Sequence, residues 1–584
     1  MKKIVEKSIR GRAWVVPDEN DSWFAADTDL LQRILAARGI SKDDAEKFLN
    51  PAVKEYMPDP FVLCDCERAV DIISDAIIKK EKIAVYGDYD VDGITSTAIF
   101  VKYLSDVGAD VVWHLPTREG EGYGLNPDAV RQLATDGVKL IITVDCGISG
   151  APEVGLAKSL GMRVVVTDHH SPDDTLPPAD AVVNPKRNDD TSGLSYLAGV
   201  GVAFLVLVAL NRKLKSLGLP DLNEKLESIN LLNCLDCVAL GTICDTMPLI
   251  ELNRAFVATG LKVLNLQQNL GLKTLMRVAK VDKVSVYAAG FVLGPRLNAA
   301  GRLDSANPAL NLLLTDNPLI AHDLASKLDE MNKERIEIQN AIMMQATDMA
   351  EKCCASGRCS LFVCGDNWHG GVMGIIAGRL KDRYNLPTCV ATRTEGVING
   401  SGRSVVGVNL GAIVHDALAH GIITEGGGHA AAAGFSLPVE NEEKFCKFLE
   451  DSVLNQLGGN IPVADIVVDA EMDAAGATMK LIQQLSKLEP YGQGNPEPIL
   501  ALRGSSLLFA SVMGHGANHL RGQVVTSAGT RLDFVGFNLV GTPVGDFLLD
   551  EANINTKIIL LGRLVKNDYN GRTSAQLILE DVAI

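Results

Sequence analysis

The chain has 584 residues, 47% of them hydrophobic, and a formal net charge of −17 at pH 7. This length predicts several domains, each with its own core, and the acidic charge argues against a protein coated for indiscriminate nucleic-acid binding. Any phosphate site is therefore expected to be a local groove, and clusters of carboxylates are candidate cation sites.

The first residues and the cysteines favour a protein of a reducing compartment. The start, MKKIVEKSIRGRAW, lacks the apolar segment of an export signal, and the longest apolar run, GVGVAFLVLVAL, is shorter than the roughly 18 residues of a membrane span. Cys234 and Cys237 form one CxxC without a partner pair, which favours a buried helical pair over a zinc site. We expect a cytoplasmic chain that does not contact membranes.

Residues 82–184 alternate short β-branched runs with helix-like stretches. The runs KIAVYG, DVVWHL, KLIITVD, RVVVTD and AVVN are separated by segments such as STAIFVKYLSDVG and VGLAKSLG. Such spacing is typical of crossover connections, so it predicts a parallel sheet covered by helices.

Acidic or histidine side chains follow the predicted strands. Asp88, Asp90 and Asp92 alternate after the first strand, and later strand or helix ends carry Asp145, Asp168, His169, His170 and Asp245. The carboxyl ends of parallel strands meet at one edge of a sheet, where open sheets bind their ligands. Any one of these acids alone is more commonly a turn former or helix cap, but four such clusters together predict a binding site.

The chemistry of these side chains favours divalent cations. Alternating aspartates repel one another unless a hard cation lies between them, and imidazole beside carboxylate suits Mn²⁺. The number of ligands suggests two ions, which together form a template for in-line attack on phosphorus. The sequence therefore predicts hydrolysis of a phosphoester or phosphoanhydride.

The rest of the chain contains three further patterns. Residues 317–357 have apolar residues at helical spacing, with a proline in the first turn and a glycine at the end, and predict a long helix joining two domains. A second α/β pattern follows, with CSLFVCG and PTCVAT as strands and a glycine-dense end, EGGGHAAAAGFSL. After LEPYGQGNPEP, runs such as TRLDFVGFNL and KIILLGRLV predict a small β-barrel.

Two glycine-dense stretches of the second α/β region are candidate phosphate sites. In GSGRS the missing side chains would let backbone N–H groups approach an anion, while Ser401 and Arg403 add a hydroxyl and a guanidinium group. GGGH offers a similar arrangement with His429. Each stretch alone could equally be a tight turn.

The motifs resemble those of a known superfamily. YGDYDVDG, VDCGIS, TDHH and ALGTICDTMPL, in this order, resemble the four motifs of the DHH phosphoesterases. PTREGEGYGLN, LAGVGVAF, GPRLNAAGRLDSA, WHGGVMGIIAGRL, GSGRS, GGGHAAAAGFS and LEPYGQGNPEP resemble, within that superfamily, the RecJ family of bacterial single-stranded-DNA-specific exonucleases. The resemblance covers nearly the whole chain.

This resemblance implies an α/β fold with a parallel-sheet DHH domain and a smaller α/β DHHA1 domain, joined by a long helix, and a C-terminal OB-like β-barrel. The expected boundaries are an N-terminal segment at 1–60, the DHH domain at 61–315, the connecting helix at 316–357, the DHHA1 domain at 358–455 and the OB-like domain at 456–584.

The resemblance also implies the roles of individual residues. The expected ligands of two Mn²⁺ or Mg²⁺ ions are Asp88, Asp90, Asp92, Asp145, His169 and Asp245. Catalysis is expected from Asp90, Asp145, His169 and His170, with His170 orienting or stabilising the scissile phosphate. The expected groups for the 5′-terminal phosphate and the nucleotides behind it are Arg118, Arg296, Arg302, Ser401, Arg403 and His429.

Two assignments stay open at this level. Strand-like alternation would point Asp90 away from Asp88 and Asp92, unless the segment has already turned into a loop. In the fourth motif, Asp236 lies well before Asp245, and a cap or surface role is favoured for it.

In the barrel, Phe534, Phe537 and Tyr569 are candidates for stacking on bases, although some of them could be core residues. They lie among the basic residues Arg521, Arg531, Lys566 and Arg572.

The implied activity is metal-dependent 5′ to 3′ hydrolysis of single-stranded DNA to mononucleotides in recombination and repair. A helicase and a single-strand-binding protein are the expected partners of a monomeric enzyme. A DHH phosphodiesterase or phosphatase for short oligonucleotides or nucleotides, and a non-catalytic replication scaffold, are the alternatives. The barrel and long helix count against the first, and the retained acids count against the second.

Overall fold

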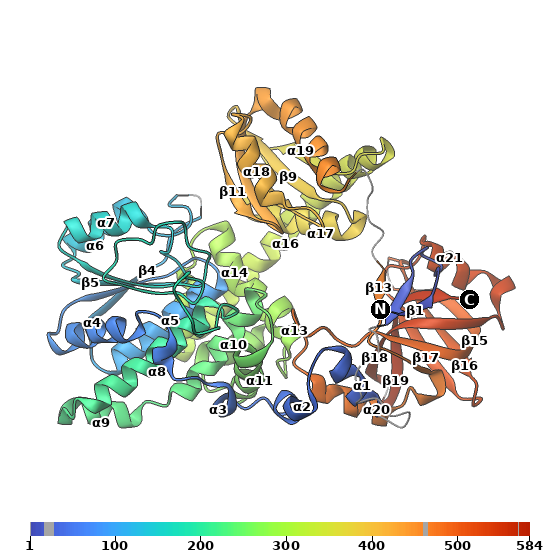
Figure 1. The fold of residues 1–584 in the computed structure, drawn as a ribbon, viewed down its shortest axis with the longest axis horizontal. Helices are drawn as coiled ribbons and strands as arrows, with labels where there is room; N and C mark the ends of the chain where they lie inside the picture. Colours follow the sequence, from blue (N-terminus) through green and yellow to red (C-terminus); the bar gives the residue numbers. More distant parts are fainter. Residues whose placement is uncertain (1, 17–28, 119, 459–464, 515, 570) are drawn as a thin grey trace. The chain divides into compact units, whose positions relative to one another are not determined.

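The computed structural model describes residues 2–16, 29–118, 120–458, 465–514, 516–569 and 571–584 (Figure 1). It divides the chain into two compact units. One unit comprises Pro58–Asp245 and Gly260–Pro462, and the other comprises Met1–Met57, Thr246–Thr259 and Val463–Ile584. Within the expected N-terminal segment, residues 17–28 lie outside the described residues.

The first unit contains the parallel sheet that the sequence predicts, in the order β4-β3-β5-β6-β7. Its strands are β3 (Ile83–Tyr86), β4 (Val111–His114), β5 (Leu140–Val144), β6 (Arg163–Thr167) and β7 (Ala181–Val183). The central strands are buried on both faces, as β-branched runs in a covered parallel sheet should be. Because every strand pair is parallel, the carboxyl ends of β3, β5 and β6 lie at one edge.

Helices cover both faces of this sheet (Figure 1). One face carries α4 (Cys66–Ile78), α5 (Val91–Asp106) and α8 (Gly199–Ser216), and the other carries α6 (Pro127–Thr135) and α7 (Ala151–Ser159). The helices that follow are α9 (Pro220–Ser228), α10 (Leu235–Cys244), α11 (Glu251–Asn265), α12 (Leu270–Val278), α13 (Val286–Ala288), α14 (Gly294–Leu303) and α15 (Asn307–Leu314).

The long helix that the sequence predicts is α16 (Pro318–Ala355). The Asn317 side chain caps its start by accepting from two backbone N–H groups, and Pro318 occupies the first turn, where its missing N–H costs nothing. The helix packs against α12, α14 and α15 and also against the elements of a second sheet.

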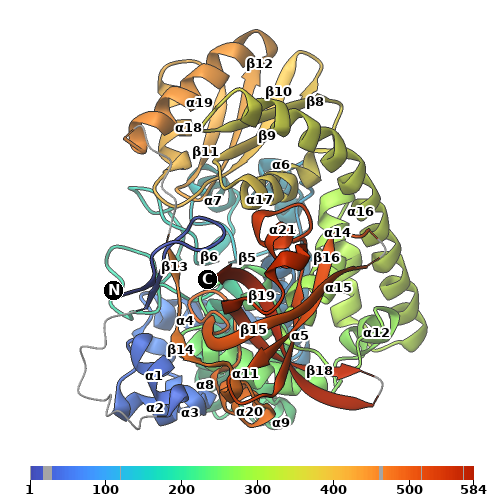
Figure 2. The same cartoon turned by 90° about the vertical axis from the view of Figure 1, so that its right-hand side faces the viewer.

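The second sheet has the order β11-β12-β10-β9-β8 (Figure 2). Its strands are β8 (Leu361–Asp366), β9 (Thr388–Thr394), β10 (Val397–Arg403), β11 (Glu425–His429) and β12 (Ala432–Pro438). The helices α18 (Leu410–Ala419) and α19 (Glu442–Gln456) share a core with one face. The end of α16 and α17 (Met373–Tyr384) share a core with the other.

The second unit contains the predicted β-barrel. Its sheet has the order β14-β15-β16-β17-β19-β18, and β15 also pairs with β18, which closes five strands into a barrel. The strands are β14 (Ala470–Asp473), β15 (Leu500–Met513), β16 (His519–Thr526), β17 (Arg531–Gly536), β18 (Lys557–Tyr569) and β19 (Arg572–Ala583). The helices α20 (Met479–Leu485) and α21 (Pro543–Leu549) belong to the same unit.

The described N-terminal residues fold with this barrel. The strands β1 (Lys2–Val5) and β2 (Trp14–Val16) form a small sheet with β13 (Ile466–Val467), and Trp14 donates its indole N–H to the buried Asp581. Three short helices follow: α1 (Leu30–Ala37), α2 (Lys42–Leu49) and α3 (Val53–Tyr56). The apolar face of α1 joins the core of the barrel.

In the part of the chain that the structure describes, no single helix is both long and apolar enough to cross a membrane. One bent pair, Pro220–Ser228 with Leu231–Cys244, meets that test on length and composition alone.

Candidate metal centre

The first aspartate motif lies in a loop rather than in a strand. The strand β3 ends at Tyr86, Asp88 is buried beyond it, and Asp90 is the N-cap of α5, accepting from the Gly93 N–H. The chain folds back so tightly that a Cβ added at Gly93 would lie 2.5 Å from the Asp88 backbone nitrogen. The objection from strand alternation therefore does not apply to Asp90.

Asp92 lies in the first turn of α5 and accepts hydrogen bonds from the N-terminus of α8. Its two carboxylate oxygens accept from the backbone N–H groups of Gly199, at 2.7 Å, and Val200, at 2.9 Å. Gly199 has no room for a side chain, because an added Cβ would lie 2.5 Å from Oδ1 of Asp145. The helix terminus thus fixes Asp92 while leaving each of its oxygens a second lone pair.

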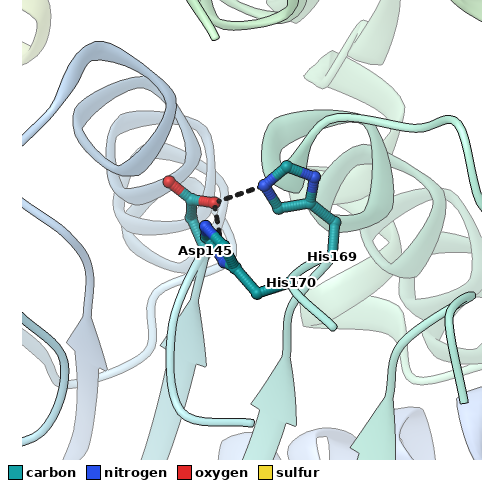
Figure 3. A group of neighbouring side chains, drawn as sticks. All are labelled: Asp145, His169 and His170. Atoms are coloured by element: carbon teal, nitrogen blue, oxygen red, sulfur yellow. Dashed lines mark ion pairs between the residues drawn. The ribbon is translucent and has the colours of Figure 1, made fainter. Parts of the chain in front are cut away.

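The histidines that follow β6 converge on the acid that follows β5 (Figure 3). Nε2 of His169 lies 3.2 Å from Oδ1 of Asp145, and Nδ1 of His170 lies 3.9 Å from the same oxygen. Nε2 of His169 also lies 3.5 Å from Oδ2 of Asp245, which caps the end of α10. Asp145 has a positive φ of 59°, a conformation that aspartate tolerates better than most residues.

The two histidines are held in different protonation states. Burial and the neighbouring His170 lower the pKa of His169 to about 3, so its ring is neutral. Its Nδ1–H donates to the Leu197 carbonyl at 3.0 Å, which leaves the Nε2 lone pair directed at the acids. Burial opposes protonation of His170, but its hydrogen bond to Asp168 and the charges of Asp168 and Asp245 raise its pKa to about 9.

Asp168 organises the histidine loop. Its Oδ2 accepts from the Ile148 N–H, and its Oδ1 accepts from the N–H groups of His169 and His170 and lies 2.8 Å from Nδ1 of His170. Although burial opposes ionisation, these hydrogen bonds lower its pKa below the ordinary aspartate value. Asp168 is therefore ionised, and its hydrogen bonds orient the loop that carries His169 and His170.

The other buried acids resist ionisation until a positive charge is supplied. Burial and the charge of Asp90 raise the pKa of Asp92 to about 7, and burial and Asp92 raise that of Asp245 to about 8. The pKa values of Asp88 and Asp145 are raised well above normal by burial and by neighbouring aspartates.

Four ligand atoms at this edge of the sheet are buried without a hydrogen-bond partner: Oδ1 of Asp88, Oδ1 of Asp145, Nε2 of His169 and Oδ2 of Asp245. Three groups of side chains have their ligand atoms within 4.8 Å of one another: Asp88, Asp90 and Asp145; Asp92, His169 and Asp245; and Asp145, His169 and His170. Oxygen and imidazole donors that are buried, convergent and unpaired fit divalent cations.

Sequence reasoning missed Tyr123. Its hydroxyl lies 2.9 Å from Nδ1 of His170 and donates to the Asp145 carbonyl oxygen at 3.4 Å. Gly122 and Gly124 on either side have φ of 81° and 82°, which turn the loop so that the ring reaches the site. The GYG triplet in the motif PTREGEGYGLN was the available signal.

Both glycine-rich stretches of the second sheet are strands, and for GSGRS this corrects the expected backbone cradle. Ser401 and Arg403 lie on β10, whose backbone groups pair with both β9 and β12, so the N–H groups of this stretch are not free for an anion. The glycines instead leave part of one face of the sheet without side chains. Ser401 on β10 pairs with Gly434 on β12, and Gly434 pairs with Gly427 on β11. The next row on that face is Arg403, Ala432 and His429.

The start of α17 adjoins Ser401 and Arg403. A Cβ added at Gly374 would lie 2.9 Å from Nη2 of Arg403 and 3.2 Å from Oγ of Ser401. Among the described residues no acid pairs with Arg403, whose Nη1 donates to the Gly402 carbonyl and to Oγ of Ser401. A guanidinium group, a hydroxyl and a helix N-terminus together suit a phosphate.

The three remaining arginines have different surroundings. Arg118 stacks on Tyr89, 4.3 Å from the ring centroid, and its buried Nε has no hydrogen-bond partner. Arg302 donates to the Gly371 carbonyl, and Arg296 forms an ion pair with Asp329 of α16. The charge of Arg296 is thus already balanced, whereas Arg118 and Arg302 form no ion pair with a carboxylate among the described residues.

Outside the centre, the structure decides two assignments that the sequence left open. Phe534 is fully buried in the barrel core, so it cannot stack on a base, whereas Phe537 and Tyr569 are exposed, as is Phe509, which sequence reasoning missed. Asp236 is buried rather than at the surface, and burial raises its pKa to about 6.

Comparison with known proteins agrees with this geometry. Family models match residues 82–242 (DHH family, N-terminal domain), 355–455 (DHHA1 domain) and 468–581 (RecJ OB domain). The single-stranded-DNA-specific exonuclease RecJ of Salmonella typhimurium is 36% identical over 95% of both chains. The chain belongs to the RecJ family. RecJ of Thermus thermophilus is 31% identical over 90% of this chain and 72% of its own.

Solved RecJ structures share the fold. The structure of Thermus thermophilus RecJ in complex with Mn²⁺ matches 95% of this chain and 75% of its own, with a TM-score of 0.78 at 28% identity. The complex of the same protein with Mg²⁺ matches with a TM-score of 0.71 at 27% identity. Thermus thermophilus RecJ thus binds both of the metals that the donor set here would suit.

Proposed function

We propose that the chain is a metal-dependent exonuclease that hydrolyses single-stranded DNA from the 5′ end to mononucleotides, in recombination and repair. The observation that carries the proposal is the convergence of four buried, unpaired ligand atoms at the carboxyl edge of a parallel sheet. Membership of the RecJ family supports the substrate and the reaction type.

We propose two cation positions, for Mn²⁺ or Mg²⁺. Asp88, Asp90 and Asp145 could hold one ion, and Asp92, His169 and Asp245 could hold the other, with Asp145 close enough to His169 to serve both. When bound, two such ions supply Lewis acidity and an activated water for displacement at phosphorus.

The chain's own residues would orient the reaction. Asp168 and Tyr123 fix the ring of His170, and the raised pKa keeps that ring positively charged at neutral pH. A charged imidazolium beside the acids can neutralise a phosphate oxygen as negative charge develops there. His169, held by the Leu197 carbonyl, keeps its lone pair directed inward.

Ser401, Arg403 and His429 are proposed to bind the 5′-terminal phosphate, supported by their place on one face of the second sheet. Arg118 and Arg302 are proposed to bind the strand behind it. Arg296 is the least supported of the proposed contacts, because Asp329 already pairs with it.

The two alternative functions fit less well. A phosphodiesterase for short oligonucleotides has no use for a closed barrel of the RecJ OB type. A non-catalytic scaffold would not need to retain unpaired buried acids, which are costly in the absence of a ligand.

We further propose the domain boundaries given by the sequence, a monomeric state, a cytoplasmic location, and a helicase and single-strand-binding protein as partners. These proposals rest on the family resemblance.

The test uses the purified chain with Mn²⁺ and single strands labelled at either end. We expect the 5′ label to be released at once as a mononucleotide, while the 3′-labelled strand shortens progressively. Omission of metal or addition of EDTA should stop both reactions. Release of the 3′ label first, or internal cuts, would overturn the polarity, and the absence of hydrolysis with either metal would overturn the activity.

A further inference from the structure

The buried face of α16 changes character along its length. The buried residues are alanine and leucine near the start, and isoleucine and alanine near the end, but between them the same face carries Asp329, Asn332, Arg335 and Gln339. These four are spaced by three or four residues, so they form one stripe along the helix. A helix stabilised only by packing would be apolar here too, so this polar stripe needs another explanation.

Arg335 is the member of the stripe that lacks a counter-ion. Only 8% of its surface is exposed, and its guanidinium donates to Oδ1 of Asn332 at 2.7 Å and Oε1 of Gln339 at 3.0 Å. Both partners are neutral amides, and its Nε, although buried, has no partner. Among the described residues no carboxylate pairs with Arg335.

The nearest acid of the stripe is already occupied. Asp329 pairs with Arg296 at 2.9 Å and with Lys333 at 2.7 Å. Burial of an unpaired guanidinium is costly, and Asn332 and Gln339 orient it without neutralising it. The arrangement is that of a binding group whose partner comes from outside the chain.

Other cations surround Arg335. Burial, and then the charges of Arg379 and Arg296, lower the pKa of Arg335. Burial, and then the charges of Arg118 and Arg335, lower the pKa of Arg302 to about 10. Arg118, Arg302 and Arg335 therefore form a series of mutually repelling guanidinium groups, two of which carry an unpaired Nε.

We propose that Arg335, oriented by Asn332 and Gln339, binds an internal phosphodiester group of the single strand, as a contact on α16 separate from the terminal-phosphate site at Ser401 and Arg403. The identity of the ligand rests on the proposed function, and the anion-binding character rests on the geometry alone. The fork of a guanidinium group matches two phosphate oxygens, and an incoming phosphate would neutralise the charge that the protein leaves unpaired.

The test compares Arg335→Met with the wild type in binding a 5′-hydroxyl dT20 strand in EDTA, over a series of NaCl concentrations. We expect affinity to fall about 10-fold or more, as for loss of a charge-assisted contact. The slope of log affinity against log salt should become shallower by about 0.7, the value for one phosphate on a single strand. Because the slope does not depend on the folded fraction, it decides the outcome even if the variant is less stable.

Two further variants are controls. Lys327→Met removes one exposed charge from the same helix and should leave the slope unchanged. Arg335→Lys keeps the charge but loses the fork, so it should keep the slope and lose part of the affinity. A slope for Arg335→Met equal to that of the wild type, especially with a lowered unfolding temperature, would assign Arg335 to the scaffold and overturn the inference.

The same preparation separates this inference from the proposed function. Hydrolysis of the strand by the wild type with Mn²⁺, together with an unchanged slope for Arg335→Met, would overturn the phosphodiester site alone. A shallower slope in a chain that does not hydrolyse DNA would support the site and overturn the exonuclease.

Discussion

The two neighbouring histidines of this centre, His169 and His170, have different protonation states and different roles. His169 is neutral and directs a lone pair at three acids, whereas His170, the next residue, is protonated by its contact with Asp168. The difference arises because burial and the charge of His170 lower the pKa of His169, whereas at His170 burial is outweighed by the hydrogen bond to the Asp168 carboxylate together with the charges of Asp168 and Asp245, which raise the pKa. The roles of the histidines are thus set by burial and by the charged groups that each ring contacts.

The metal ligands give the first prediction at this scale. His169→Ala and Asp145→Ala should each lower nucleotide release with Mn²⁺ by about 100-fold or more, since removal of even a supporting group commonly costs 10- to 100-fold. Asp173→Ala, an exposed acid in the same loop, should be as active as the wild type. Circular dichroism should show all three folded. Full activity of either ligand variant would contradict the assignment of the centre.

A second prediction concerns the stability of the metal-free chain. The pKa values of Asp92 and Asp245 are raised to about 7 and about 8 in the folded state, so the folded chain binds protons that the unfolded chain releases near pH 4. The free energy of unfolding should therefore fall as pH rises from about 4 to about 8. Thermal unfolding in EDTA measures this directly.

Mn²⁺ provides the control for the pH experiment. Cations replace the protons on these carboxylates, so the increase in unfolding temperature on adding Mn²⁺ should grow between pH 5.5 and pH 8. Asp92→Asn should reduce the pH dependence of the metal-free chain. A metal-free chain equally stable across this range would show that the acids are not protonated as the burial implies.

At the scale of elements, Gly427 and Gly434 of the second sheet are regular strand residues, and their effect is that they carry no side chain. Gly427 and Gly434 lie in the row of Ser401, so one face of β10, β11 and β12 is open beside a hydroxyl, a guanidinium group and an imidazole. The backbone groups of β10 and β12 are paired on both sides within the sheet. An anion on this face must therefore be held by side chains and by the start of α17.

Arg403→Ala tests this face. Loss of the charge-assisted contact should cost about 1.5 to 3 kcal/mol of binding to a 5′-phosphorylated strand and much less to a 5′-hydroxyl strand. Affinities are to be measured for both strands in EDTA. Arg393→Ala is the matched control: Arg393 lies on β9 of the same sheet and its guanidinium pairs with Glu442 of α19, so this variant should not distinguish the two strands. Equal losses on both strands would place Arg403 away from the terminal phosphate.

Much of this organisation could be read from the sequence, because strand patterns, strand-end acids and the long helix are local signals. Position at a strand end could not by itself separate Asp168 from the other acids, since one of its partners, the Ile148 N–H, comes from another strand end. The placement of Ser401 on a strand depends on pairing with β9 and β12, and the burial of Arg335 depends on what packs over α16. Contacts of this kind are not encoded in local composition.

At the scale of the whole molecule, the barrel unit is assembled from three separated stretches of chain. Arg254, fully buried, donates to the carbonyls of Phe48, Leu488, Glu489 and Pro490, which joins all three stretches. Removing the barrel strands would expose the apolar face of α1, which packs into the barrel core. A truncated chain could therefore lose DNA affinity because it is misfolded. Substitutions at exposed positions leave the core intact and test DNA binding directly.

Phe537 and Tyr569 are exposed aromatics of the barrel unit, and aromatic stacking in single-strand-binding barrels contributes about 1 to 3 kcal/mol per base. Phe537→Ala and Tyr569→Ala should weaken binding of a dT30 strand by this amount while leaving hydrolysis of a dT4 strand nearly unchanged. Phe534→Leu, in the buried core, should lower the unfolding temperature and leave the affinity of the folded chain for dT30 intact. If both surface variants bound dT30 as tightly as the wild type, these two rings would not be the stacking platform, and the exposed Phe509 would be the next position to substitute.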